Sequence, residues 1–196
     1  MNDKLPIYKL RVDKEDSGVD YIALVDHPAI QRNWMAFSEE KQNFYVENED
    51  QMILSGALMI ADLPIFRRSE SLGEHYVIFD KETISTIVKR YFKNKFTSNV
   101  NLMHEQTAKV DGVYLFESYI INRERGIKPP KGFEGVSDGS WFGSFKVDNK
   151  EVWDDFVKTG KLKGFSVEGE FAHEPFEQKK LTDIEKIIAI IEQIKP

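Results

Sequence analysis

Apolar and polar residues alternate along much of this chain, which is the pattern of β-strands with one buried face. We expect strands at residues 6–12, 19–25, 75–79, 99–104, 113–121 and 141–147, and another strand around Ser166. Residues 52–60 are apolar almost throughout, which predicts a strand buried on both faces. The pattern is weaker elsewhere: we expect a loop or short edge strand at 38–50 and an irregular connection at 63–68.

Three segments show the period of amphipathic helices. The clearest covers residues 80–92 and begins with Asp80 as N-cap. Asp148 is expected to cap a second helix at 149–159, and a stripe of isoleucines predicts a third at 182–194. Between the strands, residues 122–140 are rich in glycine, proline and charge, which predicts a long mobile loop of the kind that is often functional or disordered.

Strands therefore outnumber helices, which favours an α+β fold. We expect a mixed or mainly antiparallel sheet or barrel with about three helices packed around it. Residues 1–175 are expected to form one domain, and residues 176–196 a C-terminal amphipathic helix.

Composition narrows the function classes. The 196 residues include no cysteine, which excludes disulfides, a cysteine nucleophile and cysteine-based metal sites. The net charge of −6 disfavours general nucleic-acid binding. We see no signal peptide and no apolar stretch long enough to span a bilayer, so we expect a soluble intracellular protein. A phosphate-binding loop and a Gly-x-Ser-x-Gly elbow are both missing from the sequence.

Ser166 and His104 are the candidate catalytic pair. Ser166 stands between a glycine turn and an alternating strand, and serine needs a neighbouring base to become a nucleophile. His104 lies at the end of a predicted strand, where it could reach a cleft as that base or remain a buried structural residue. On a regular strand His104 shares a face with Leu102, whereas Asn101 and Met103 point the other way.

Two carboxylates could orient such a histidine. Glu168 shares a strand face with Ser166, about 6–7 Å away between Cα atoms, and would supply the third role of a triad unless it is simply solvated. Glu117 is predicted on the face of Leu115 and Tyr119, and a carboxylate on an apolar face needs a partner.

The other polar candidates are weaker. His27 is predicted in a turn, and His75 is predicted at the start of a strand. His173 follows the strand of Ser166. His104 and Glu105 are unsuited to a common metal ion, because adjacent strand residues point to opposite faces. We therefore expect no metal and no cofactor.

Several segments, in order from about residue 5 to 172, together resemble one family. Residues 20–30 resemble the Leu-Val-x-x-Pro-Ala stretch of phage prohead proteases. Six further segments resemble the XkdF-type phage serine proteases: residues 56–67, 101–104, 116–119, 139–141, 152–153 and 164–169.

This resemblance implies a capsid maturation protease with a fold distantly similar to the herpesvirus assemblins, with Ser166 as nucleophile and His104 as general base. The usual prohead proteases carry the Pro-Ala strand after the serine and begin it with an acidic residue. Here it precedes the histidine, as in a permuted chain, and Tyr21 takes the acidic position with Asp20 beside it. The third member is therefore Glu168, Glu117 or Asp20, in that order.

The resemblance carries further expectations. His173 is an outside candidate by analogy with the Ser–His–His arrangement of assemblins, and backbone amides, Arg123 or Arg125 could serve as oxyanion donors. The substrates would be phage scaffold and major capsid precursor proteins, cleaved inside the prohead in the host cytoplasm. We expect a homodimer or higher homo-oligomer that binds neither nucleic acid nor membrane. The alternative is a non-enzymatic head-assembly or scaffold protein that retains an inactive protease fold.

Overall fold

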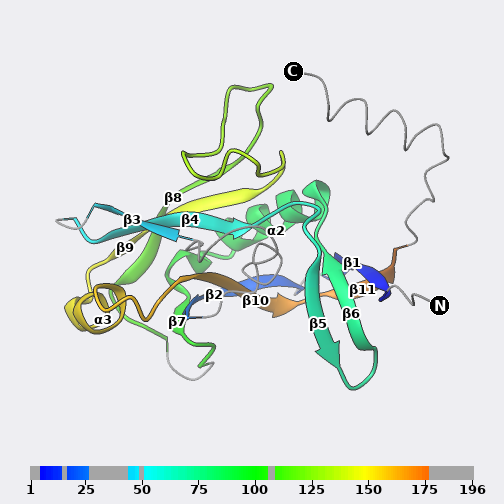
Figure 1. Cartoon of the computed structure of the whole chain (residues 1–196), viewed down its shortest axis with the longest axis horizontal. Coiled ribbons are helices and arrows are strands. Elements are labelled where there is room, and N and C mark those ends of the chain that lie inside the picture. The colour runs from blue at the N-terminus through cyan, green and yellow to red at the C-terminus, as the bar shows by residue number, and fades with distance from the viewer. Residues whose placement is uncertain (1–4, 15–16, 27–43, 49–50, 106–108, 177–196) are drawn as a thin grey trace.

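The computed structural model of the chain describes residues 5–14, 17–26, 44–48, 51–105 and 109–176, and its fold is α+β (Figure 1). The strands are β1 Ile7–Arg11, β2 Gly18–Val25, β3 Phe44–Asn48, β4 Ile53–Met59, β5 Ile65–Ser69, β6 Gly73–Ile78, β7 Val100–Leu102, β8 Val113–Ile120, β9 Trp141–Val147, β10 Gly164–Glu170 and β11 Ala172–Pro175. The helical elements are α2 Lys81–Lys93, the 3₁₀ turn η1 Phe96–Ser98, α3 Lys150–Val152 and the π turn η2 Trp153–Val157.

The strands form three sheets with the orders β11-β1-β6-β5, β10-β2-β7 and β3-β4-β9-β8. Two pairs, β1 with β6 and β2 with β7, are parallel, and every other pair is antiparallel. The prediction of a mixed or mainly antiparallel sheet is thus confirmed. The alternative of a barrel is wrong for the described residues, because each sheet keeps two open edges there.

Helix α2 begins where the sequence predicts. The carboxylate of Asp80 accepts a hydrogen bond of 2.9 Å from the backbone N–H of Thr83, so Asp80 caps the first turn. Arg11 of β1 donates to the same carboxylate at 2.5 Å and ties the helix to the first sheet. Burial acts to raise the pKa of Asp80, but the hydrogen bonds from Thr83 and Arg11 outweigh it and lower this pKa to about 2.

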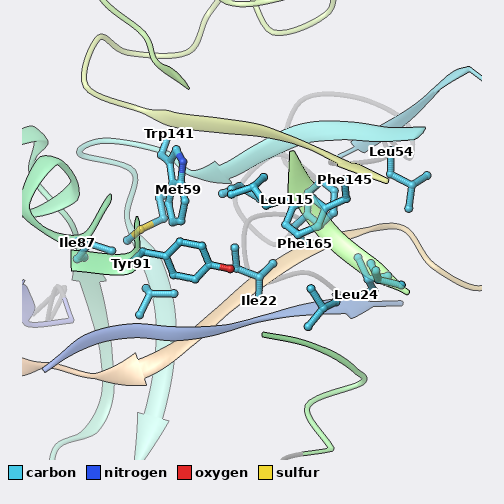
Figure 2. Packing of buried hydrophobic residues seen from close by; sticks show 14 of the residues in the cluster. Ile22, Leu24, Leu54, Met59, Ile87, Tyr91, Leu115, Trp141, Phe145 and Phe165 are labelled. Atoms are coloured by element: carbon cyan, nitrogen blue, oxygen red, sulfur yellow. The ribbon is translucent and has the colours of Figure 1, made fainter. Parts of the chain in front are cut away.

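The main core lies between β2 and β10 on one side and β4, β8 and β9 on the other, with α2 closing one end (Figure 2). Aromatic side chains fill much of it: the rings of Phe145 and Phe165 lie 4.8 Å apart, and those of Tyr91 and Trp141 lie 5.4 Å apart. The Tyr91 hydroxyl is buried in this core without a hydrogen-bond partner among the described residues. This core supports β10 from the side that carries Phe165, and so holds the strand of Ser166 in place.

Several sequence predictions need correction. Residues 63–68 are not an irregular connection, because β5 begins at Ile65 and pairs with β6 along its whole length. Strand β11, which carries His173, was not predicted at all. Both strands were missed because their partners β6 and β1 supply the pairing, while their own apolar pattern is short.

The described residues contain two α-helices, not about three. The second, α3, is a single turn capped by Asn149 and not by Asp148, and it continues as a π turn instead of a regular helix to residue 159. The predicted helix at 182–194 lies outside the described residues. Of the segment 38–50, predicted as a loop or short edge strand, the described residues 44–48 form the edge strand β3.

Residues 122–140 form a long connection between β8 and β9, as predicted. The side chain of Arg123 joins separate parts of this connection through hydrogen bonds. It donates to the Asp138 carboxylate and to the carbonyls of Glu134 and Val136. A small apolar cluster that includes Val136 and Phe142 packs the connection against the outer face of β4 and β9. These contacts hold the connection against its own small core and argue against the mobile loop that its composition predicts.

Candidate active site

Ser166 lies in the middle of β10, opposite Ala23 of β2. The β2–β10 pairing runs without a bulge from Gly164 to Glu168, so Ser166 and Glu168 occupy the same face, as the alternation predicts. Ser166 is 8 % exposed. A bulge follows Glu168, where Gly169 approaches the backbone of Gly18 so closely that a Cβ atom would overlap it.

The chain turns sharply just before His104. Strand β7 ends at Leu102, and both Met103 and His104 adopt left-handed backbone conformations, with φ of 52° and 63°. Such conformations are unfavourable for residues other than glycine and cluster at functional sites. The prediction that His104 shares the strand face of Leu102 is therefore wrong, because the turn directs its side chain toward Glu168 on β10.

His104 and Glu168 form the central contact of the site. The Nδ1 atom of His104 lies 2.8 Å from Oε1 of Glu168. An ionised carboxylate can only accept hydrogen bonds, so Nδ1 carries the proton in this contact. In the neutral imidazole Nε2 is then left as the acceptor, which is the tautomer that a general base requires.

Asn101 binds the same carboxylate oxygen of Glu168. Its Nδ2 group donates to Oε1 of Glu168 at 2.8 Å, and its side chain is fully buried. The pairing of β2 with both neighbours places Asn101, Ala23 and Ser166 in one row across the sheet. The Oδ1 atom of Asn101 is buried and has no partner among the described residues, which is rare in folded proteins.

Ser166, His104 and Glu168 all line one cleft of about 450 Å³ between β10 and the first sheet. No hydrogen bond joins the Ser166 hydroxyl to His104 in the described part of the chain. Of the expected triad, the structure thus forms the His104–Glu168 contact and brings Ser166 to the same cleft. Contacts between nucleophile and base are often loose without substrate, so this geometry is compatible with catalysis.

The other carboxylate candidates do not approach His104. Glu117 follows a bulge in β8, which moves it from the face of Leu115 to the outer face of its sheet. There it accepts a hydrogen bond of 2.6 Å from Ser144, whose hydroxyl accepts one of 2.8 Å from Ser55. The prediction that Glu117 needs a partner is confirmed. The prediction that Glu117 lies on the same strand face as Leu115 is wrong.

Asp20 lies on β2 beside a smaller cavity that Glu168 and Glu170 also line. Partial burial, together with the negative charges of these two glutamates, raises the pKa of Asp20. Its side chain forms no hydrogen bond or ion pair with the imidazole of His104, which contacts Glu168 instead, so Asp20 contributes charge near the site without orienting the histidine.

Two further histidines line the cleft. His75 and His173 come from β6 and β11, their rings lie 6.0 Å apart, and both pack edge-on against Tyr8. The Nδ1 atom of His75 lies 2.9 Å from the carbonyl oxygen of Gly73. His173 is thus near the site, as the assemblin analogy suggests, but its ring contacts are with Tyr8 and His75. His27 lies outside the described residues.

Sequence reasoning missed Asn101 as a functional residue and Arg67 and Arg68 as residues of the cleft. The three-residue spacing from Asn101 to His104 could have drawn attention to the first, but nothing in the sequence locates the arginines. The suggestion of Arg123 as an oxyanion donor finds no support, because that side chain is bound to Asp138 and Val136 within its own connection.

No group of three or more histidine or acidic side chains among the described residues could hold a metal ion. None of the described helices is long and apolar enough to cross a membrane. Comparison of the chain with protein-family models, curated proteins and solved structures finds no match.

Proposed function

We propose that this protein is a serine endopeptidase in which Ser166 is the nucleophile, His104 the general base and Glu168 the group that orients His104. The observation that carries the proposal is the 2.8 Å contact between His104 Nδ1 and Glu168 Oε1 in the cleft that Ser166 also lines. This contact leaves Nε2 of His104 as the atom that can accept a proton.

In the proposed reaction, Ser166 Oγ attacks the carbonyl carbon of a peptide bond and its proton passes to Nε2 of His104. The resulting imidazolium is stabilised by the Glu168 carboxylate. When the C–N bond breaks, His104 returns the proton to the leaving amine, and an acyl ester remains on Ser166. Water then attacks the ester carbonyl while His104 takes its proton. The bond between this carbon and Ser166 Oγ breaks, the carboxyl product leaves, and His104 returns the proton to Oγ. The first step requires Oγ and Nε2 to come within hydrogen-bond distance once the substrate is bound.

The biological setting of the proposal is phage head assembly. This setting is supported by the ordered resemblance to XkdF-type phage serine proteases. The proposed chemistry is supported by the His104–Glu168 contact. In this setting the substrates are phage scaffold and major capsid precursor proteins, cut within the prohead in the host cytoplasm. An assemblin-like architecture and a homodimer or higher homo-oligomer belong to the same proposal.

A second candidate function is a non-enzymatic head-assembly or scaffold protein with an inactive protease fold. The observation that favours it is the missing hydrogen bond between the Ser166 hydroxyl and His104 in the described part of the chain. In an inactive protein, the His104–Glu168–Asn101 network would serve only to pin the end of β7 against β10.

Co-expression with phage head precursor proteins tests the proposal. Wild type should process the precursors, whereas Ser166→Ala should leave them intact, with an unchanged melting temperature. Ser69→Ala is the matched control, because Ser69 is a serine of the same cleft that lies on β5. Reaction with a fluorophosphonate, read by peptide mass spectrometry, should place the adduct on Ser166. Processing by Ser166→Ala at the wild-type rate would refute the proposal, and an inert wild type would favour the scaffold function.

A further inference from the structure

The cleft beside Ser166 opens directly onto the main hydrophobic core. Its lining includes Leu58, Ile65, Val77, Phe79 and Phe165, which are all at most 8 % exposed and all belong to that core. When a ligand displaces water from the apolar floor of an open cleft, the free energy of the system falls, which favours binding. The floor therefore favours an apolar group of a bound molecule.

The charges around the cleft point to the same class of ligand. Glu168 is the only carboxylate among the described residues that line it, and this group already accepts hydrogen bonds from His104 and Asn101. Arg67 and Arg68 line the cleft as well, from β5. A lysine or arginine side chain of a substrate would thus meet two cations, although Arg68 also pairs with Glu74 at 3.4 Å outside the cleft. The one carboxylate within the cleft is already held by two hydrogen bonds, so burial of a further cation would be unfavourable.

The size of the cleft also fits a large side chain. Its volume of about 450 Å³ lies within the range of about 300–1,000 Å³ that is typical of ligand sites. One wall is the partly buried ring of Phe171, which packs edge-on against Phe79 at 5.0 Å. Because Phe171 is only partly buried, changing it should disturb the fold less than changing the buried apolar residues of the floor.

We infer that this cleft is a specificity subsite for a bulky apolar side chain, leucine, isoleucine, methionine or phenylalanine, next to the bond that is cut, and that it rejects lysine and arginine. The inference rests on the proposed peptidase function, whose substrate class it specifies. Phe171 is the specificity-determining residue of the wall, and its ring limits the size of the side chain that enters.

Peptides that differ only at one residue beside the cut bond test the inference. Wild type should cleave the leucine and phenylalanine peptides about 10–100-fold faster in kcat/KM than the alanine peptide, from the transfer free energy of such side chains. The lysine peptide should be the poorest. Phe171→Ala should raise the ratio of phenylalanine to leucine cleavage. Phe116→Ala, at an exposed Phe on β8 of the third sheet and outside the cleft, should leave this ratio unchanged. Equal rates for lysine and leucine, or identical profiles for both variants, would overturn the inference.

A binding measurement separates this inference from the proposed function. The same peptides are titrated calorimetrically into Ser166→Ala, which retains the cleft without the nucleophile. Tighter binding of the leucine peptide than of the alanine and lysine peptides supports the subsite even if wild type cleaves nothing, in which case only the proposed function fails. Ser166-dependent cleavage without any apolar preference, in rates or in binding, would refute the subsite and leave the peptidase proposal standing.

Discussion

Glu168→Gln is the substitution that tests the catalytic proposal most directly. In the transition state His104 carries a positive charge, and the Glu168 oxygen that stabilises it lies 2.8 Å from Nδ1. Glutamine keeps the size of the side chain and one acceptor oxygen but removes the negative charge. The substitution therefore probes the electrostatic part of the contact with little change in packing.

The magnitude follows from the contact distance and the exposure of the pair. At 2.8 Å two unit charges attract by about 1.5 kcal/mol in water and by about 6 kcal/mol at an effective dielectric constant of about 20. The His104 side chain is 47 % exposed and that of Glu168 is 15 % exposed, so the pair lies between these limits. A loss of about 3 kcal/mol corresponds to a decrease of about a hundredfold in kcat.

Because the charge on His104 exists only in the transition state, kcat should fall while KM stays near the wild-type value. Glu170→Gln is the matched control: it makes the same charge change two residues further along β10, at an exposed position. Initial rates of peptide cleavage for both variants, with melting temperatures to verify folding, provide the assay. Equal kcat for Glu168→Gln and wild type, with Ser166→Ala inactive, would show that Glu168 does not assist His104.

Two predictions concern stability. Asp80→Asn should lower the free energy of unfolding by about 2 kcal/mol at pH 7, since the pKa of Asp80 falls from 3.8 to about 2 on folding. A lowered pKa stabilises the fold above about pH 4 and ceases to do so as the pH falls through 2, so urea unfolding should show the difference shrinking over that range, and a constant difference would contradict the assignment. Tyr91→Phe should raise the free energy of unfolding by about 1 kcal/mol, because its buried hydroxyl has no partner among the described residues. A clear loss of stability in urea unfolding would instead reveal a partner for this hydroxyl.

Local patterns in the sequence account for much of the fold. The strands β2, β8 and β9 and the Asp80 cap of α2 are predicted from neighbouring residues alone, and the structure confirms them. Strands β5 and β11 escaped prediction because their pairing partners lie elsewhere in the chain. The arrangement of the strands in three open sheets likewise depends on contacts between distant segments.

The candidate site divides in the same way. The shared strand face of Ser166 and Glu168 follows from local alternation, because the alternation of a regular strand does not depend on the rest of the chain. The carboxylate that meets His104 depends instead on how distant segments pack together. The left-handed turn at Met103 and His104 directs the imidazole to Glu168, and a bulge in β8 removes Glu117 to another sheet face. Turns and bulges of this kind reverse the face of every residue that follows, and they are set by long-range packing that local periodicity does not contain.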